Sequence, residues 1–393
     1  KANGGKPWVI DAEGAFIVYD AGIANGASNP VCPVESISNA IYSVGSSGDY
    51  MPKLTIRGGT WTGARISGNW DNVTGGTEHA CMTFRYIDGI DVIGGRFFDF
   101  QQDAITLQDV GVEGGRLLYN YFKDMGDAAM EFRGGGGYEA AHNLVERCRH
   151  IVGCKPNITN VHVHHNQGST FGIGIFGHGT TWVIEKNIVS VATTSDGKDG
   201  NTANGIEISD AGGLVAPTAA SGFKVLGNTV AARSGASCFL TRSISAHTLT
   251  DVLVAQNTFL GGGTGTVNIG NGTGIRIENN PRIDVPSGAS AAAVQIASAA
   301  TGTIVADNTI TALGSVRGVS VSGTDCHVRD NTISTATGEC VRGQSGSHRL
   351  TVRGNTVTTS GAADCIRCDG TDSDASFNRA TQGAAGTLGA LAM

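Results

Sequence analysis

The chain has 393 residues, of which 59 are glycine and 8 are proline, and only 16% are charged. This composition disfavours long helices, because Gly, Ser, Thr, Asn and β-branched residues prefer turns and strands, and so few prolines disfavour a disordered polymer. The net charge of −7 comes without a Lys/Arg cluster, so no nucleic-acid partner is expected, and no run of 18 apolar residues predicts membrane insertion.

Residues 1–52 follow no regular pattern. We expect them to form an N-terminal cap and a first irregular coil, because the open end of a stack of strands needs cover. Strand-like patterns begin at 53–61 (KLTIRGGTW) and continue at 87–100 (IDGIDVIGGRFFDF). The first residues include neither an initiator Met nor the apolar segment of a signal peptide, so a cleaved leader stays possible.

From about residue 115 the chain returns to one pattern, apolar-x-apolar-x-x-Asn-x-apolar, as in FKVLGNTV and CHVRDNTI. Most of its asparagines recur about every 23 residues, a period typical of stacked repeats. They are Asn120, Asn143, Asn166, Asn187, Asn228, Asn257, Asn280, Asn308, Asn331, Asn355 and Asn378. Asn tolerates the left-handed backbone that a sharp corner demands, and stacked amides can form a ladder. The repeat predicts an all-β fold, a right-handed parallel β-helix with Asn-ladder corners over residues 53–379, followed by a C-terminal tail at 380–393.

Two aspartates precede neighbouring predicted strands. Asp103 in QQDAITLQD and Asp127 in MGDAAMEFRG are one coil apart by the period of the repeat, so we expect their carboxylates to stack at the strand entrances. One interpretation is turn capping, because Asp before a strand often binds nearby backbone. The other is a carboxylate pair for acid–base work, in which proximity raises one pKa.

Strand alternation predicts which charged side chains face outward. If Met130 and Phe132 point inward, Glu131 and Arg133 point outward, and the same pattern in a later strand sends Glu207 outward, with Asp210 just after it. Between them lies FGIGIFGHG (171–179), whose glycines would leave a hollow with His178 at its edge. A carboxylate there suits glycosidase chemistry, while a solvated surface Glu remains the alternative.

The site is therefore expected on the outer face of the coils at 100–215, walled by an insertion at 193–205. The catalytic candidates are Asp103, Asp127, Glu131, Glu207 and Asp210, and the candidates for substrate binding are His178, Arg133, Tyr138, Phe171 and Phe176. The favoured working pair is Asp127 with Glu131 or Glu207 with Asp210.

Histidines gather in NVHVHHN (160–166). If Val161 and Val163 point inward, His162 and His164 face outward, where a metal cluster with an Asp or Glu is one alternative and a solvated surface the favoured one. No phosphate-binding loop, nucleophile elbow or HExxH motif occurs. We expect no cofactor and no metal.

Nine cysteines are an odd number, so they cannot all pair within one chain. Their strand-like flanks predict small buried thiols. Cys365 and Cys368 form a CxxC pair that could be a redox or zinc motif, but no second CxxC accompanies it.

The Asn-cornered coils, the segment IRGGTWTG (56–63) and the coil DAITL (103–107) resemble the pectin-lyase-like β-helix superfamily, and within it the tailspike depolymerases of tailed phages. The resemblance implies a homotrimer on the virion that hydrolyses glycosidic bonds of a bacterial capsule or O-antigen with paired carboxylates. The alternatives are a lyase acting on a uronate-containing glycan, with His178, Arg133, Lys198 or Tyr138 serving as a basic or aromatic base near a neutralised uronate, a non-catalytic glycan-binding spike, and a secreted bacterial enzyme.

Overall fold

The structure, a computed structural model, describes residues 7–18, 41–44, 50, 52–63, 81–100, 103–111, 114–155, 158–192, 203–209, 219–242 and 249–383. Within these ranges the regular elements are all β-strands, and no helix long and apolar enough to cross a membrane occurs in them. The chain divides into two compact units. The first contains Lys1–Val183, Thr193–Asn201 and Gly212–Val215, and the second Ile184–Ala192, Thr202–Ala211 and Ala216–Met393.

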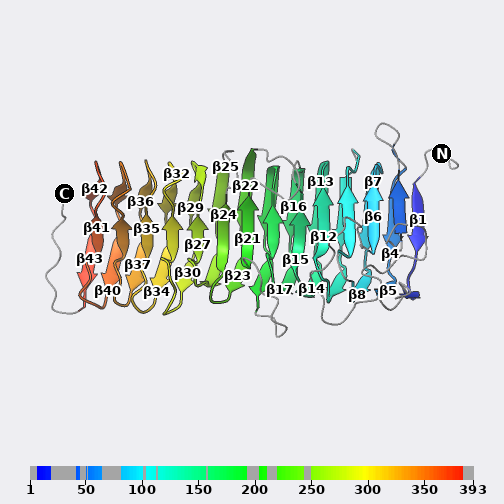
Figure 1. Cartoon of the computed structure of the whole chain (residues 1–393), viewed down its shortest axis with the longest axis horizontal. Helices are drawn as coiled ribbons and strands as arrows, with labels where there is room; N and C mark the ends of the chain where they lie inside the picture. The colour runs from blue at the N-terminus through cyan, green and yellow to red at the C-terminus, as the bar shows by residue number, and fades with distance from the viewer. Residues whose placement is uncertain are drawn as a thin grey trace, which may run out of the picture. The chain divides into compact units, whose positions relative to one another are not determined.

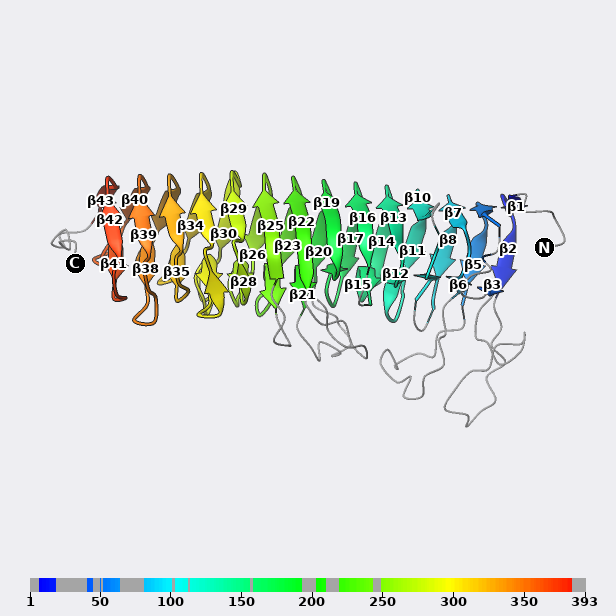
Figure 2. The same ribbon diagram turned by 90° about the horizontal axis from the view of Figure 1, so that it is seen from above.

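In the first unit, three parallel sheets each take one strand from every turn of the chain (Figures 1 and 2). Sheet A has the order β1 (Trp8–Asp11), β4 (Leu54–Arg57), β7 (Gly89–Ile93), β10 (Gly114–Leu118), β13 (Gly136–Ala141), β16 (Thr159–His164). Sheet B has β2 (Phe16–Val18), β5 (Thr60–Thr62), β8 (Arg96–Phe98), β11 (Tyr121–Lys123), β14 (Leu144–Cys148), β17 (Gln167–Thr170). Sheet C has β3 (Ile41–Val44), β6 (Met82–Arg85), β9 (Ile105–Gln108), β12 (Ala128–Arg133), β15 (His150–Cys154), β18 (Ile175–Gly177).

The second unit repeats this arrangement. Its sheet A strands are β22 (Ala220–Leu226), β25 (Leu249–Ala255), β29 (Arg276–Glu278), β33 (Ile304–Ala306), β36 (His327–Arg329), β39 (Thr351–Arg353) and β42 (Asp374–Ser376), with β28 (Gly272–Thr273) and β32 (Ala300–Thr301) beside them. Sheet B contains β20 (Ile188–Val191), β23 (Thr229–Ala232), β26 (Thr258–Gly261), β30 (Arg282–Val285), β34 (Thr309–Ala312), β37 (Thr332–Thr335), β40 (Thr356–Thr359) and β43 (Arg379–Gln382). Sheet C contains β21 (Asn204–Ser209), β24 (Ser237–Arg242), β27 (Val267–Ile269), β31 (Val294–Ile296), β35 (Val319–Val321), β38 (Val341–Gly343) and β41 (Ile366–Cys368). The strand β19 (Thr180–Glu185) belongs to sheet A, and the boundary between the two units falls within it, after Val183.

The predicted fold class is confirmed: the chain forms a parallel β-solenoid of about 11 turns with Asn-ladder corners. Strands within the segment 1–52 already take part, because Trp8 of β1 pairs with Leu54 of β4 in parallel register. At the other end, β43 continues to Gln382. The predicted insertion at 193–205 lies outside the described residues up to position 202.

The core is built from the apolar residues that flank each ladder asparagine. Val225 and Val230, on either side of Asn228, are both 0% exposed. In the first unit, aromatic rings occupy such positions and stack across coils. The ring of Phe97 lies 6.3 Å from that of Trp61 and 5.1 Å from that of Phe122, centroid to centroid. The inward alternation predicted from the repeat therefore makes a continuous apolar interior.

The ladder forms within each unit. The amide oxygen of Asn143 accepts hydrogen bonds from the backbone and side-chain nitrogens of Asn120 at 2.9 and 3.1 Å, and the pattern repeats from Asn228 to Asn257. The predicted left-handed backbone is wrong for the asparagines themselves. It falls instead on the residue before each of several of them, such as His142 at φ 57° and Gln256 at φ 60°. The residue before each Asn bends the chain, and the Asn side chain then hydrogen-bonds to backbone groups of the neighbouring coils.

Eight of the nine cysteines lie in the described ranges, and all are free thiols there. Seven of them are buried and Cys368 is half-buried, which confirms the prediction of small buried thiols. Burial raises the pKa of the Cys238 thiol to about 12, so it is inert at neutral pH. Cys32 lies outside the described residues.

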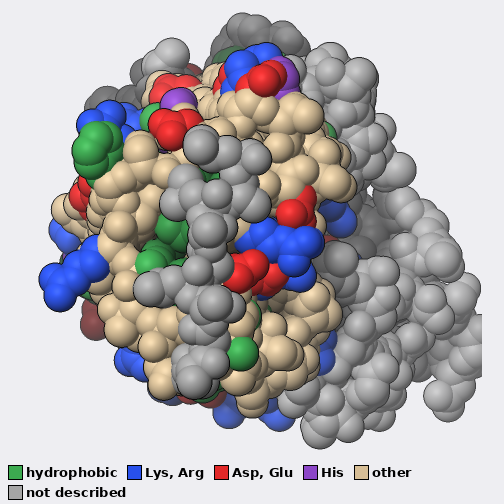
Figure 3. Space-filling model, turned by 90° about the vertical axis from the view of Figure 1, so that its left-hand side faces the viewer, with side chains coloured by type: hydrophobic (Ala, Val, Ile, Leu, Met, Phe, Trp, Pro, Cys, Tyr) green, Lys and Arg blue, Asp and Glu red, His purple; other side chains and the backbone are tan. Residues whose placement is uncertain are grey.

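On the outside of the second unit, charged residues pair with each other. Arg342 contacts Glu339 at 2.6 Å and Asp369 at 2.7 Å, and Arg349 contacts Asp325. On the face shown in Figure 3, acidic and basic side chains likewise lie next to one another.

Candidate active site

The candidate active site lies on sheet C of the first unit, where β12 pairs with β9 and β15. Met130 and Phe132 are 0% exposed in the core, and the alternation of the strand places Glu131 and Arg133 on the opposite face, as predicted. Glu131 is nevertheless only 3% exposed. It is an outward residue that its neighbours cover.

Asp103 lies beside Glu131, not beside Asp127 as its spacing predicted. Ile105 pairs with Met130, so Asp103 faces Ala128 and its carboxylate accepts the Ala128 N–H at 3.0 Å. The register between the two strands is 25 residues, one more than the spacing that the sequence suggested. Asp103, 2% exposed, forms a side-chain hydrogen bond with Glu131 and accepts another from Thr106 at 3.2 Å.

Two cations compensate this buried pair. The Arg133 guanidinium donates to Glu131 at 2.6 Å and to Asp103 at 3.4 Å. The Lys155 ammonium lies 3.3 Å from the other Glu131 oxygen. Lys155 follows β15, one coil beyond Glu131, and its side chain is 43% exposed. Both Glu131 oxygens therefore have a cationic partner.

The two carboxyl groups titrate in opposite directions. Burial, together with the negative charge and hydrogen bond of Glu131, raises the pKa of Asp103 well above its usual value. Burial also opposes ionisation of Glu131, but the hydrogen bond with Asp103 and the charges of Arg133 and Lys155 outweigh it and lower the pKa of Glu131 to about 2. Within this coupled pair a proton therefore favours Asp103 and the negative charge favours Glu131.

Asp127 lies at the exposed edge of this cluster. Its carboxylate is 3.4 Å from His150 Nε2 and 3.6 Å from the Arg149 guanidinium, and its side chain is 34% exposed. The other ring nitrogen of His150 lies 2.6 Å from the Ile173 carbonyl oxygen. Burial lowers the pKa of His150, although Asp127 partly opposes this, so the imidazole is neutral at pH 7.

An aromatic ring borders the cluster on its third strand. Glu131 pairs with Gly153, and Val152 pairs with Ile175, so Gly153 and Phe176 are neighbours in the same outward row. Gly153, which has no side chain, lies between Glu131 and Phe176 in that row. Phe176 is half-buried, so part of its ring is accessible.

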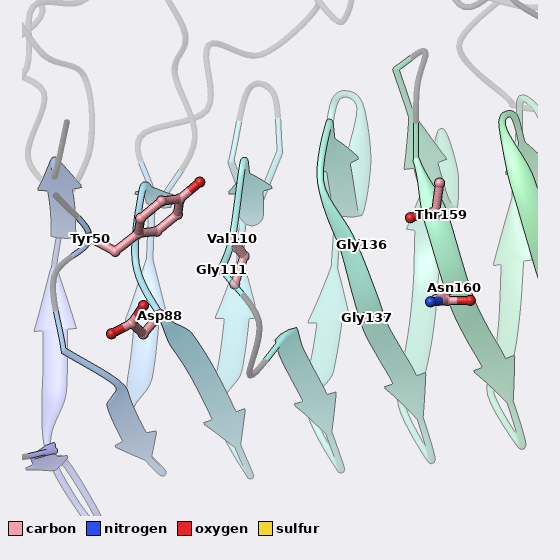
Figure 4. Close-up of a pocket in the computed structure, with 8 residues that line it drawn as sticks. All are labelled: Tyr50, Asp88, Val110, Gly111, Gly136, Gly137, Thr159 and Asn160. Atoms are coloured by element: carbon pink, nitrogen blue, oxygen red, sulfur yellow. The ribbon is translucent and has the colours of Figure 1, made fainter. Parts of the chain in front are cut away.

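A pocket of about 470 Å³ lies at the next corner of the first unit (Figure 4). Its lining residues are Tyr50, Asp88, Val110, Gly111, Gly136, Gly137, Thr159 and Asn160. The ring of Tyr50, which is 37% exposed, packs edge-on against Tyr86 at 5.9 Å. An exposed aromatic ring with a carboxylate and an amide nearby is suited to binding a sugar, and none of these residues was predicted.

Glu207, in the second unit, has different partners. It is 0% exposed, its Oε2 accepts from Asn204 at 2.8 Å, and its Oε1 lies 2.9 Å from the Arg242 guanidinium. Burial raises the pKa of Glu207, and Arg242 and Asn204 reduce this rise. Asp210, its predicted partner, lies outside the described residues.

Three predicted binding residues are buried in this structure. Tyr138 is 1% exposed, stacks on Phe132 at 4.6 Å and donates its hydroxyl hydrogen to the Gly134 carbonyl. His178 is 0% and Phe171 8% exposed. The predicted glycine hollow is also wrong at Gly172, where an added Cβ would meet the Arg149 side chain at 2.7 Å.

Three cluster residues, Arg149, His150 and Lys155, were missed in the sequence. The repeat itself held the signal, because His150 lies one coil after Asp127 and Lys155 lies one coil after Glu131. Extending the same periodicity from each acidic candidate to the next coil would have found them.

No family model and no curated protein matches the chain. Among solved structures, the Dettilon tailspike protein has 14% sequence identity over 88% of this chain and 60% of its own, with a TM-score of 0.40. A double mutant of the tailspike protein of E. coli bacteriophage HK620 has 12% identity over 99% of this chain and 71% of its own (TM-score 0.44). The A-module of the mannuronan C-5 epimerase AlgE4 from Azotobacter vinelandii has 14% identity over 100% of this chain and 92% of its own (TM-score 0.36). These likenesses are of low sequence identity and concern the fold alone.

Proposed function

We propose that the chain is a polysaccharide depolymerase that hydrolyses glycosidic bonds of a bacterial surface polysaccharide. The observation that carries this proposal is the buried pair of Asp103 and Glu131, which share Arg133 as a partner and whose pKa values are shifted in opposite directions, that of Asp103 upward and that of Glu131 downward. Glycoside hydrolysis needs a group that protonates the leaving oxygen and a carboxylate that activates water or attacks the sugar. This cluster contains both kinds of group.

In the proposed reaction the buried pair is the proton donor. Asp103 passes its proton to the ionised Glu131, and Glu131 gives that proton to the glycosidic oxygen as the C–O bond breaks. Because Glu131 is only 3% exposed, substrate binding has to uncover it. Asp127, the most exposed carboxylate of the cluster, takes a proton from the water that attacks the anomeric carbon. Proton exchange with solvent then restores the pair.

Substrate binding is assigned to the aromatic groups that border the cluster. Phe176 offers a face beside Glu131, and Arg149 and Lys155 supply positive charge for an acidic glycan. The pocket at Tyr50 is suited to a further sugar unit (Figure 4). Together these groups favour an extended, charged polysaccharide over a small neutral sugar.

We also propose that the protein acts as a homotrimer on a phage virion, outside the host cell. This proposal rests on the resemblance of its Asn-cornered coils to tailspike depolymerases. Light scattering should give three times the chain mass of 40.2 kDa, and a single chain mass at micromolar concentration would contradict the trimer.

A lyase is the second candidate, and one observation favours it. His150 has a lowered pKa and is neutral at pH 7, so it could remove a proton from a uronate whose carboxylate is neutralised by Arg149 or Lys155. A lyase leaves an unsaturated sugar that absorbs near 235 nm, whereas a hydrolase creates a reducing end without this absorbance.

The test is digestion of a panel of capsular and O-antigen polysaccharides, with products read by mass, reducing ends and absorbance near 235 nm. Glu131→Gln and Asp127→Asn should each lower the rate by roughly 10²–10⁴-fold with the fold retained. Glu146→Gln is the matched control, because Glu146 lies on sheet B of the same unit and is half-exposed. Glu207→Gln and Asp210→Asn test the other predicted pair.

Two outcomes would overturn the proposal. If Glu131→Gln and Asp127→Asn cleave as fast as the wild type, the catalytic centre is elsewhere. If the panel is bound but never shortened, the chain is a glycan-binding spike.

A further inference from the structure

Three histidines gather at a corner of the first unit, away from the carboxylate cluster. His142 follows β13, His164 ends β16, and His165 comes next in the chain. One ring nitrogen of each can be chosen so that all three lie within 4.8 Å of one another. His142 and His165 are exposed and His164 is half-buried, so the cluster is open to solvent.

The β-solenoid repeat brings these side chains together. His142 and His165 are one coil apart, and each precedes a ladder residue, Asn143 or Asn166. Both have a left-handed backbone, with φ of 57° and 54°, so they project from the same point of successive coils. Their rings stack at 5.0 Å, and Tyr119, at the same point one coil earlier, stacks on His142 at 4.9 Å.

A column of stacked rings does not by itself explain the orientation of His164. Its Nδ1 lies 2.9 Å from Nδ1 of His165, while its Nε2 lies 3.0 Å from a carboxylate oxygen of Glu139. The carboxylate can only accept, so the His164 proton belongs on Nε2 and its Nδ1 presents a lone pair. In this contact Nδ1–H of His165 donates to that lone pair, and a bound metal ion would take the place of this proton.

This arrangement is typical of histidines that bind metals. A metal-binding imidazole usually donates its second N–H to a carboxylate, which fixes the tautomer and ring orientation. Glu139 occupies that position for His164. In tetrahedral Zn²⁺ sites the Zn–N bonds are about 2.0–2.1 Å, which places ligand nitrogens roughly 3.4 Å apart. The Nδ1 atoms of His164 and His165 are already near this separation. His142 is exposed, so rotation of its side chain can bring its ring nitrogen to a similar distance from both.

We propose that His142, His164 and His165 bind a divalent first-row transition ion such as Zn²⁺, with Glu139 orienting His164. Three imidazoles suit Zn²⁺, Ni²⁺, Cu²⁺ or Co²⁺ and not Ca²⁺ or Mg²⁺, which take oxygen ligands. The fourth position stays open to water or to a further group. Because the ligands come from two successive coils, the ion would also join these coils at the corner. This proposal replaces the expectation of no metal.

The experiment uses the full chain with any purification tag removed. The protein is stripped with EDTA, dialysed, and titrated with ZnCl₂ and CoCl₂, and bound metal is measured after equilibrium dialysis. We expect one ion per chain, visible Co²⁺ absorption of a low-symmetry nitrogen site, and a higher melting temperature with Zn²⁺.

The variants are chosen so that they fold. His142→Asn and His165→Asn keep a residue that tolerates the left-handed backbone but remove the imidazole, and each should weaken Zn²⁺ binding by at least about 10-fold. Glu139→Gln should weaken it by about 10-fold or more, because the carboxylate that orients a ligand strengthens metal binding by about this much. His327→Asn, at an exposed histidine of the second unit, is the control and should bind like the wild type.

Binding of less than 0.2 ion per chain at micromolar Zn²⁺ would overturn the proposal. So would equal binding by the wild type and the doubly substituted His142→Asn/His165→Asn protein, with unchanged circular dichroism, because the ion would then sit elsewhere.

Discussion

Replacing one ladder asparagine should destabilise the protein far more than replacing an outward one. Asn257 is 0% exposed. Its amide nitrogen donates to Asn280 Oδ1 at 3.1 Å and to the Val225 carbonyl at 2.9 Å. Its amide oxygen accepts from the backbone and side-chain nitrogens of Asn228 at 2.9 and 3.0 Å. Asn257→Ala removes all of these bonds at once.

The expected loss in the free energy of unfolding follows from the polar groups that stay buried without a hydrogen-bond partner. Each buried hydrogen bond contributes about 1 kcal/mol net, and each buried group left without a partner costs about 1–3 kcal/mol. The Asn228 N–H loses its acceptor in the core, and the Asn280 amide oxygen loses one donor. We therefore expect Asn257→Ala to lower the free energy of unfolding by about 3–5 kcal/mol.

The assay is urea unfolding followed by far-UV circular dichroism, with both the midpoint and the unfolding rate recorded. Asn257→Asp is a second variant: it keeps an acceptor for Asn228 but sets a buried carboxylate oxygen against the Val225 and Asn280 oxygens, so at neutral pH it should cost at least as much as Asn257→Ala, and less at acid pH where the carboxyl group is protonated. Asn268→Ala is the control, because the Asn268 amide makes only a 3.4 Å contact with the Thr264 carbonyl at an exposed site. A loss below about 1 kcal/mol for Asn257→Ala, equal to that of the control, would refute the assigned role of the ladder.

Asp103→Asn should leave the protein at least as stable at pH 7. The raised pKa of Asp103 means that the folded state binds more protons than the unfolded state above about pH 4, so the wild-type protein loses stability as pH rises there. The neutral amide of the variant should remove this pH dependence. Urea midpoints measured between pH 4 and 8 test this, and the same change of midpoint with pH in both proteins would contradict it. Lys155→Met should raise the lowered pKa of Glu131, because it removes one of the two cations beside that carboxylate. The ionised Glu131 stabilises the fold above about pH 4.3 and this stabilisation is lost as pH falls toward 2, so acid unfolding of the variant should begin at a higher pH. At pH 7 the free energy of unfolding should fall by only about 1–2 kcal/mol, because Lys155 is 43% exposed and Arg133 remains. Gly114→Ala should cost clearly more than Gly94→Ala in thermal melting: both glycines have positive φ, but an added Cβ at Gly114 would meet a backbone oxygen at 2.0 Å and one at Gly94 would meet nothing within 4 Å. Equal melting temperatures would show that crowding at Gly114 is relieved.

The sequence alone determined the fold, because every coil follows the same local rule. An apolar residue three before and two after Asn228 or Asn257 points inward, and the Asn closes the corner by bonding to the next coil. A rule repeated at nearly constant spacing can be read without any long-range information, since each coil contacts only its neighbours. The same rule correctly sent Glu131 to the outer face.

Only the tertiary structure decided the partners on that face. A register one position longer than the predicted one sets Asp103 opposite Ala128, and the longer Glu131 side chain, three residues further along β12, hydrogen-bonds to it, while Asp127 contacts His150. Strand alternation gives the face that a side chain takes but not the register between coils. The alternation of a strand also predicts whether a side chain faces the core or the outer surface, but not which neighbouring side chains bury it. Tyr138 therefore looked available for a sugar and is buried against Phe132, because strand patterns carry no information about packing between coils.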